Sequence, residues 1–259
     1  MKVIILCGGQ GTRLREETEY KPKPMVEIGG KPIIWHIMKL YSHYGYKDFV
    51  LALGYKGNVI RDYFLNYFNY NNDFSIELGT GKTTVYGSHD EHDWKVTLVE
   101  TGADSMTGYR VKSCQKYITE DRFMLTYGDA VCNVNIEELV SFHIKSEKIG
   151  TVTGVYPPSR FGDLTIQGEQ VLHFKEKSKD TGLQAPINGG FFVFKKEIFD
   201  LIDDDPKCDF ERKPMDRLTE QNQLSIFKHS EFWQCMDTYR DYEYLNDLWK
   251  SKPEWKVWE

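Results

Sequence analysis

The stretch KVIILCGGQGTRLREETEYKPKPM, residues 2–25, joins an apolar run to a glycine-rich turn. The run Val3 to Leu6 is short, apolar and rich in β-branched residues, which predicts a buried strand. Gly8, Gly9 and Gly11 follow at once, and glycines let a backbone adopt positive φ angles and approach a ligand closely. Successive backbone N–H groups in such a turn form a concave anion site. The stretch therefore predicts a strand that leads into a phosphate-binding loop.

Basic side chains follow the glycines. Arg13 carries a forked donor suited to phosphate, and Lys21 and Lys23 alternate with prolines that hold the segment extended. The spacing G-G-x-G is neither a Walker A loop nor the dinucleotide fingerprint G-x-G-x-x-G. A tight glycine turn with solvated lysines is the simpler alternative. The order of strand, glycines, Thr-Arg and Lys-Pro-Lys-Pro within one window favours the phosphate site.

The length, the net charge and the cysteine content restrict the class of protein. The chain has 259 residues and a formal net charge of −6, which argues against a general binder of nucleic acid or anionic membranes. We expect no signal peptide and no membrane span, because no apolar run approaches the ~20 residues that a bilayer requires. The five cysteines contain no C-x-x-C pair, so neither a zinc site nor a disulfide framework is indicated. Reduced thiols in a cytoplasmic protein are the simple interpretation.

Strand and helix patterns alternate through the first 149 residues. We expect strands at 48–53, 95–100 and 122–126, and helices at 33–45, 57–68, 109–117 and 135–146. The alternation predicts right-handed crossovers and a parallel sheet flanked by helices, an α/β fold. Residues 69–94 are polar and irregular, so we interpret them as a loop with solvated His89 and His92.

The pattern changes at Gly150, where the expected strands become short. They are 151–155, 164–167, 171–175, 190–194 and 224–227, with helices at 196–203, 211–222 and 239–249. Prolines and glycines between them suggest a smaller mixed or antiparallel sheet region that covers one end of the first sheet. The final KPEWKVWE is aromatic, so we expect it to dock on its own body or on a neighbouring subunit.

Polar residues follow two of the expected strands, where ligands bind in parallel sheets. The turn 101–110 (TGADSMTGYR) is a candidate contact for a nucleobase and ribose, or an ordinary connection. Asp129, after strand 122–126, is a hard oxygen ligand suited to Mg²⁺. It could instead cap helix 135–146, although Asn135 fits that cap better. Asp237 could cap helix 239–249 or supply a second carboxylate to the same metal.

A second polar group lies in the later half of the chain. Glu176 and Lys177 end the strand 171–175, and Asn188 and Gly189 begin the strand 190–194. A lysine suits phosphate, and an acid and an amide suit hydroxyl groups. The group therefore suits a sugar phosphate, although each residue alone is an ordinary surface feature.

Seven segments spread over the chain resemble the sugar-1-phosphate nucleotidyltransferases, and most closely the branch of glucose-1-phosphate cytidylyltransferases. They are GGQGTRL, KPKPMVEIGGKPIIWHIM, TGADSMTGYR, YGD, NGGFFVF, FWQCMDTYRD and WKVWE. The resemblance implies a Rossmann-like nucleotidyltransferase fold in a single domain. Its nucleotide-binding part would span about 1–149, and its sugar-phosphate-binding and oligomerisation part about 150–259.

The same resemblance implies the reaction of CTP with α-D-glucose 1-phosphate to give CDP-glucose and diphosphate. It also implies Mg²⁺ and homo-oligomers, among them hexamers. Products of this family are precursors of bacterial surface sugars, as in the O-antigen of lipopolysaccharide. Two alternatives stay open: the same chemistry with dTTP, UTP or another sugar phosphate, and a non-catalytic nucleotide-sugar-binding subunit.

Residue roles follow from the resemblance and from charge. Arg13 and Lys23 would be catalytic, Asp129 and Asp237 would hold the metal, and Glu176, Lys177, Asn188 and Gly189 would bind the sugar phosphate. Nucleotide contacts are implied at Leu6, Gly8, Gly9, Gly11, Thr12, Arg13, Lys23, Thr101, Gly102, Ser105, Thr107, Arg110 and Gly128. The chain departs from the family at Ala130, where Gly is common, and at Ser178, where Pro is common. Either departure is expected to change the accepted sugar or the turnover without abolishing the chemistry.

Overall fold

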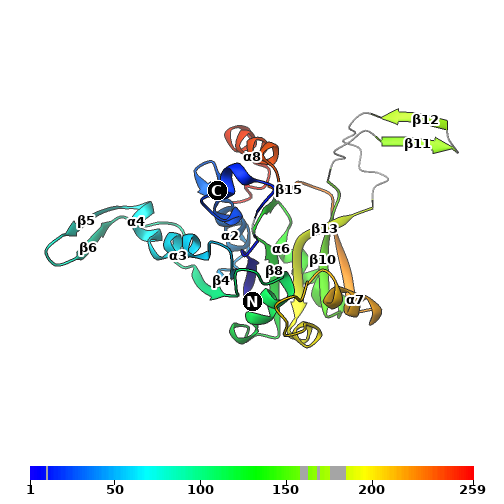
Figure 1. Cartoon of the computed structure of the whole chain (residues 1–259), viewed down its shortest axis with the longest axis horizontal. Helices are drawn as coiled ribbons and strands as arrows, with labels where there is room; N and C mark the ends of the chain where they lie inside the picture. Colours follow the sequence, from blue (N-terminus) through cyan, green and yellow to red (C-terminus); the bar gives the residue numbers. More distant parts are fainter. Residues whose placement is uncertain (10, 158–162, 168–169, 176–184) are drawn as a thin grey trace.

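A seven-stranded sheet runs through the middle of the molecule (Figure 1). The structure is a computed structural model that describes residues 1–9, 11–157, 163–167, 170–175 and 185–259. The strand order is β14-β10-β13-β8-β1-β4-β7. The strands are β1 (Val3–Leu6), β4 (Asp48–Leu53), β7 (Lys95–Glu100), β8 (Arg122–Tyr127), β10 (Gly150–Val155), β13 (Ile187–Lys195) and β14 (Leu224–His229). Neighbours are parallel except where β13 meets β8 and β10, which confirms a mostly parallel sheet.

Helices cover both faces of this sheet. They are α1 (Arg15–Thr18), α2 (Ile33–His43), α3 (Gly57–Leu65), α4 (Tyr67–Asn71), α5 (Thr107–Ser113), α6 (Ile136–Ser146), α7 (Lys213–Glu220), α8 (Tyr239–Ser251) and the 3-10 helices η1 (Lys23–Met25), η2 (Gln115–Tyr117) and η3 (Lys196–Leu201). Among the described residues, none of these is both long and apolar enough to cross a membrane.

The apolar run at the start of the chain forms the predicted buried strand, because successive strand residues point to opposite faces. Val3 and Ile5 belong to a core cluster with residues of α2, α6 and α8. Ile4 and Leu6 belong to a second cluster, with residues of α5, η3 and α7. The strand is therefore enclosed on both faces, and its carboxyl end delivers the glycine turn to the edge of the sheet.

The interpretation of residues 69–94 as an irregular loop is wrong. They contain a hairpin of β5 (Asp73–Glu77) and β6 (Lys82–Tyr86) that extends away from the sheet (Figure 1). Strand β5 alternates polar and apolar residues, but β6 begins with three polar residues and ends with two apolar ones, so the hairpin as a whole gives no clear strand pattern. His89 is also not solvated: its side chain is 12 % exposed and packs edge-on against Tyr67.

The later strands do not form a separate covering sheet. Strands β10, β13 and β14 continue the central sheet, while β11 (Asp163–Gln167) and β12 (Gln170–Lys175) form a separate antiparallel hairpin. The aromatic tail docks on its own body: Trp255 is 1 % exposed, stacks on Phe232 and donates from Nε1 to Nδ1 of His36. Of the two alternatives for the tail, the structure shows the intramolecular one.

Candidate active site

A cleft of about 590 Å³ opens at the carboxyl ends of β1 and β8. The glycine turn forms one wall, residues 103–107 before and within α5 form another, and the segment 127–130 forms the floor. Its lining also contains Arg13, Lys23, Pro24, Arg110, Trp233, Cys235 and Asp237. The structure thus brings together, from five separate segments of chain, most of the polar residues that the sequence predicted as site candidates.

Glycines allow the close packing on which the cleft depends. A Cβ on Gly128 would lie 2.7 Å from the carbonyl oxygen of Leu6 and 3.0 Å from Cγ of Pro24. Gly11 has a φ of +62°, and a Cβ there would meet the side chain of Thr18 at 2.9 Å and Cβ of Lys23 at 3.3 Å. The strand ends, the turn and the Lys-Pro segment can therefore touch one another only because these positions lack side chains.

Asp129 and Asp237 are adjacent because of one short pair of strands. The strand β9 (Ala130–Cys132) starts directly after Asp129, and β15 (Trp233–Cys235) pairs with it antiparallel, with Ala130 opposite Cys235. The amide of Met236 also donates to the carbonyl of Asp129 at 2.8 Å. Two carboxylates 108 positions apart in sequence consequently lie at the same end of one ribbon.

The cap alternatives for these aspartates are resolved by the helices. Asn135 caps α6 by accepting from the amide of Glu138, as predicted. Thr238, rather than Asp237, caps α8, in a capping box with Asp241. Neither Asp129 nor Asp237 is therefore needed as a helix cap.

Lys23 lies between the two carboxylates. Its Nζ is 2.7 Å from Oδ2 of Asp129 and 2.5 Å from Oδ1 of Asp237, and its side chain is 11 % exposed. Burial lowers the pKa of Lys23, but the charges and hydrogen bonds of Asp129 and Asp237 outweigh burial, so the pKa is raised overall. Arg13 reaches the other oxygen of Asp237 at 3.0 Å. Two cations and two anions thus converge at one end of the cleft.

This carboxylate pair fits a divalent ion that shares its coordination with a ligand. Aspartate oxygens are hard donors of the kind that Mg²⁺ prefers, and the pair already accommodates one cationic group, the ammonium of Lys23. Within the described part of the chain, no cluster of three or more His, Cys, Asp or Glu side chains could hold a metal alone. Mg²⁺ typically takes one or two carboxylates together with substrate phosphates and waters, and Asp129 with Asp237 suits that arrangement.

Arg110 connects three loops beneath the cleft. Its guanidinium is 4 % exposed and donates to the carbonyls of Gly8, Leu53, Gly102 and Ala103 and to Oγ1 of Thr101, at 2.7 to 3.1 Å. A Cβ on Gly8 or on Gly54 would lie 2.2 Å from a guanidinium atom. Burial lowers the pKa of Arg110. Arg110 therefore lines the cleft and also fixes the backbones of the turns around it.

Of the other candidate residues, some line the cleft and others lie outside it. Leu6, Gly8, Gly9, Ser105, Thr107 and Gly128 line the cleft. Gly11, Thr12, Thr101 and Gly102 do not; Thr101 is buried and donates to the carbonyl of Leu53. Asn188 and Gly189 flank the cleft through Tyr127 and Trp233, which both line it. Glu176 and Lys177, like Ser178, lie outside the described residues.

Several residues that line the cleft or bond to its lining were not among the candidates predicted from the sequence. Tyr127 stood inside the quoted YGD motif but was assigned no role, and Trp233 and Cys235 gain their positions only through the β9–β15 pairing. Glu211, which accepts a hydrogen bond from Tyr127, lies in a polar stretch without any motif. Three-residue strands and polar loops give no periodic signal, so periodicity could not find Trp233, Cys235 or Glu211. Trp233 and Cys235 do lie in the quoted segment FWQCMDTYRD, which was the one signal for them.

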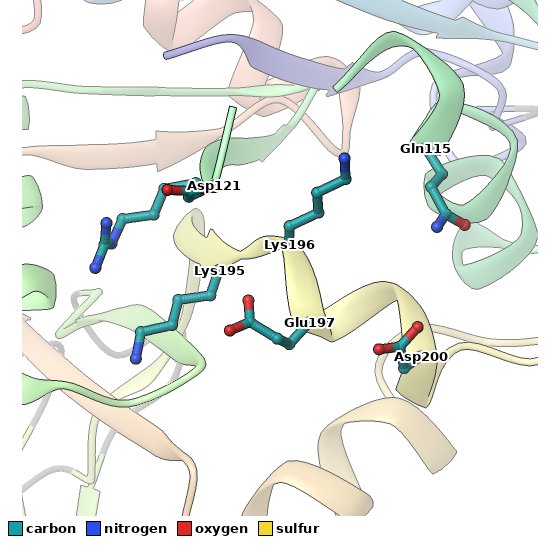
Figure 2. A pocket seen from close by; sticks show the side chains of 7 residues that line it. Gln115, Asp121, Lys195, Lys196, Glu197 and Asp200 are labelled. Atoms are coloured by element: carbon teal, nitrogen blue, oxygen red, sulfur yellow. The ribbon is translucent and has the colours of Figure 1, made fainter. Parts of the chain in front are cut away.

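A second depression, of about 520 Å³, lies at the opposite edge of the sheet, where β8 begins and β13 ends. Figure 2 shows that its labelled side chains, among them Lys195, Lys196 and Glu197, point in different directions rather than toward one centre. Acids and bases are mixed in its lining, which contains no glycine among the described residues. The depression lacks the converging charges of the cleft at the carboxyl edge, and we do not treat it as the active site.

Comparisons with known proteins give matches over most or all of the chain. The protein-family model described as "Nucleotidyl transferase" matches residues 2–252. The chain is 50 % identical to "Glucose-1-phosphate cytidylyltransferase" of Salmonella typhi and 41 % identical to "Probable glucose-1-phosphate cytidylyltransferase" of Bacillus subtilis, with all of each chain covered in both cases. The crystal structure of HddC from Yersinia pseudotuberculosis, 24 % identical, superposes with a TM-score of 0.68 over 96 % of this chain and 99 % of that one.

Proposed function

Since the chain belongs to the nucleotidyl transferase family, we propose that it is a glucose-1-phosphate cytidylyltransferase, which converts CTP and α-D-glucose 1-phosphate into CDP-glucose and diphosphate. The observation that carries the proposal is the match, over both full lengths, to the relatives of that name. The placement of Lys23, Asp129 and Asp237 in one cleft supports catalysis rather than binding alone. The product would serve as a precursor for bacterial surface sugars such as the O-antigen of lipopolysaccharide.

The reaction joins two anions, so positioning and charge neutralisation carry the catalysis. An oxygen of the sugar phosphate attacks the α-phosphorus of CTP, and the bond to the diphosphate oxygen breaks on the opposite side. We assign the amides of Gly8 and Gly9 and the side chain of Arg13 to the triphosphate and the departing diphosphate. We assign Lys23 to the α-phosphate, where negative charge builds up in the transition state.

Asp129 and Asp237 are the residues that would hold Mg²⁺. When bound, the ion would supply electrophilic stabilisation of the phosphate oxygens and a template for their orientation. Lys23 must then leave at least one carboxylate, because the ammonium and the ion would share the same acceptors. A lysine released in this way becomes available to the α-phosphate.

The sugar phosphate would bind beside Asn188 and Gly189, with Lys177 on its phosphate and Glu176 on its hydroxyl groups. Support in the described residues comes from the contacts of Asn188 with Tyr127 and of Gly189 with Trp233. We accordingly divide the single domain into a nucleotide-binding part, about 1–149, and a sugar-phosphate-binding and oligomerisation part, about 150–259.

We further propose that the chain acts in the cytoplasm as a homo-oligomer, with the hexamer as the first assembly to test. The cysteines Cys7, Cys114, Cys132 and Cys208 are buried and form no disulfide, which suits a reducing compartment. The segment from α3 to β6 exposes large apolar side chains, and an isolated two-stranded hairpin is only marginally stable. These side chains are Leu65, Phe68, Tyr70, Phe74, Ile76, Leu78 and Tyr86. In the oligomer, a second copy of the chain would cover these side chains.

A nucleotide panel tests the activity. Diphosphate release would be measured with CTP, UTP, dTTP, ATP and GTP, each with glucose 1-phosphate and with other hexose 1-phosphates, and with and without Mg²⁺. We expect release with CTP and glucose 1-phosphate that requires the divalent ion. A preference for UTP or dTTP would overturn the choice of base. Binding of CTP without any release of diphosphate would favour the non-catalytic alternative.

A further inference from the structure

Glu211 accepts hydrogen bonds from two side chains that belong to different walls of the cleft. Its Oε1 accepts from the hydroxyl of Tyr127 at 2.5 Å, and its Oε2 accepts from Oγ1 of Thr107 at 2.6 Å. Tyr127 ends β8 two residues before Asp129, and Thr107 begins α5. Both residues line the cleft, whereas Glu211 itself does not. One carboxylate thus fixes two cleft side chains from behind.

The loop that carries Glu211 is attached to the start of α5. The amides of Met106 and Gly108 donate to the carbonyls of Pro206 and Cys208, at 2.8 and 2.9 Å. A Cβ on Gly108 would lie 2.7 Å from Sγ of Cys208, so the loop and the helix touch without a side chain between them. These bonds satisfy amides that a helix start leaves without partners. The position of Glu211 therefore depends on the start of α5, which is the same cleft wall that Glu211 contacts through Thr107.

Tyr127 extends this hydrogen-bond network to Asn188, on the proposed sugar-phosphate side of the cleft. Its hydroxyl donates to Glu211 and accepts from Nδ2 of Asn188 at 3.2 Å. Its ring packs where a Cβ on Gly190 would be, at 2.4 Å. Both the ring and the hydroxyl of Tyr127 are consequently held.

The direction of these hydrogen bonds follows from Glu211. A phenol carries one O–H, so the hydroxyl of Tyr127 that donates to Glu211 can only accept from Asn188. Asn188 then turns its amide nitrogen to Tyr127, and its Oδ1 accepts from the amide of Gly190 at 2.9 Å. Among the residues that the structure describes, the second N–H of the Asn188 amide has no acceptor and remains available as a donor. A donor at that place suits a sugar hydroxyl oxygen.

We propose that Glu211 is a positioning residue that couples the nucleotide wall at Thr107 to the sugar-phosphate residue Asn188 through Tyr127. It contacts neither reacting group. It sets the orientation of Thr107 and Tyr127, and through Tyr127 the amide of Asn188, so that the two substrates are held in one geometry. This inference rests on the proposed function for the identity of the substrates.

The first test is a separation of the two Michaelis constants. Loss of one hydrogen bond weakens binding by roughly 2- to 10-fold. We therefore expect Tyr127→Phe to raise KM for glucose 1-phosphate by about fivefold and to leave KM for CTP within about twofold. Glu211→Ala should raise both constants by about fivefold, because both walls lose their common acceptor. Glu220→Gln, an exposed carboxylate on α7, is the matched control and should change neither.

Two further variants distinguish positioning from a general structural role. Glu211→Gln keeps one acceptor oxygen, so its two Michaelis constants should fall between those of the unaltered protein and Glu211→Ala. The double variant Tyr127→Phe/Glu211→Ala should have a KM for glucose 1-phosphate no higher than Glu211→Ala alone, since both changes break the same chain. If the two effects multiply instead, Tyr127 acts independently of Glu211 and the proposal is overturned.

Thermal melting of each variant checks the fold. If Glu211→Ala does not fold, then Glu211→Gln and Tyr127→Phe still decide the question. A folded Glu211→Ala with both constants unchanged would also overturn the proposal. The substrates used are the pair that the unaltered protein prefers in the nucleotide panel. A different preferred base or sugar would thus refute the proposed function while the coupling through Glu211 remained measurable.

Discussion

The ammonium group of Lys23 lies 2.7 Å from Oδ2 of Asp129, across 106 positions of sequence. The same group reaches Asp237, so one lysine neutralises both carboxylates that would hold a divalent ion. In the absence of substrate, the ammonium of Lys23 thus offsets the repulsion between the two neighbouring carboxylates. When nucleotide and ion bind, the lysine and the ion would compete for these oxygens. The ion pair therefore links metal binding to the availability of Lys23 for the α-phosphate.

Replacement of Lys23 by alanine should reduce turnover far more than it reduces stability. Loss of one charge from a preorganised site costs about 10²- to 10³-fold in kcat. Steady-state diphosphate release and thermal melting would measure the two effects. Lys21→Ala is the control, since the ion pairs of Lys21 with described residues are long, at 3.8 Å, with Glu17 and Glu27. Near-normal turnover in a folded Lys23→Ala variant would show that its assigned role is wrong.

Replacement of Asp129 by alanine should weaken binding of the divalent ion as well as lower kcat. The variant loses one of two carboxylates, so we expect a fall in kcat of about 10²-fold or more and a higher Mg²⁺ concentration at half-maximal rate. Titration of activity with Mg²⁺ would show both changes. Asp121→Asn, at the opposite edge of the sheet, should leave the titration unchanged. An unaltered Mg²⁺ requirement in Asp129→Ala would place the metal elsewhere.

Two glycines of the cleft should respond oppositely to alanine. At Gly9 a Cβ meets no atom within 4 Å, so Gly9→Ala should keep its stability, but its methyl group would stand in the path of the triphosphate and raise KM for CTP. Gly128→Ala places a Cβ 2.7 Å from the carbonyl of Leu6 and should cost about 1–3 kcal/mol of unfolding free energy. Gly79→Ala, in the distant hairpin turn and equally unobstructed, is the control. Denaturant titration and CTP kinetics would separate the two effects; an unchanged KM in Gly9→Ala would count against the glycine turn as the phosphate site.

His143 should make the unfolding free energy depend on pH below neutrality. Burial, together with the charges of Arg122 and Lys195, lowers the pKa of His143 to about 4, and its Nδ1 bonds Oγ1 of Thr151 at 2.9 Å. The unfolded chain binds this proton near its ordinary pKa of about 6.5, so stability is present above that pH and is lost as the pH falls toward 4. The loss should be on the order of 2–3 kcal/mol. Denaturant titrations at pH 7 and pH 5 should show a smaller drop for His143→Gln; an equal drop would exclude His143 as the cause.

The sequence predicted the parallel half of the fold because buried parallel strands read as unbroken apolar runs. Val3 to Leu6 and Asp48 to Leu53 are such runs, each followed by turn residues. The hairpin 73–86 was missed because it is exposed on both faces and its composition is that of a loop. Five strands after Gly150 were predicted individually and β15 was missed, but the membership of β10, β13 and β14 in the central sheet depends on long-range pairing, which no local pattern reports.

The site was predicted where a residue's role follows from its own neighbourhood. Prolines identified Lys23 as a fixed cation, and the end of a strand identified Asp129. The meeting of Asp129 with Asp237 depends on a ribbon of three-residue strands, and the role of Glu211 depends on three other segments of chain. Neither arrangement leaves a local trace in the sequence, because each arises only when distant segments pack.

A crystal structure of the protein with CTP and Mg²⁺ tests the central claim most directly. We expect the triphosphate to lie against the amides of Gly8 and Gly9, the ion between Asp129 and Asp237, and Nζ of Lys23 moved toward the α-phosphate. A triphosphate bound anywhere other than against the amino-terminal glycine turn, or a Lys23 still bridging both aspartates, would contradict it.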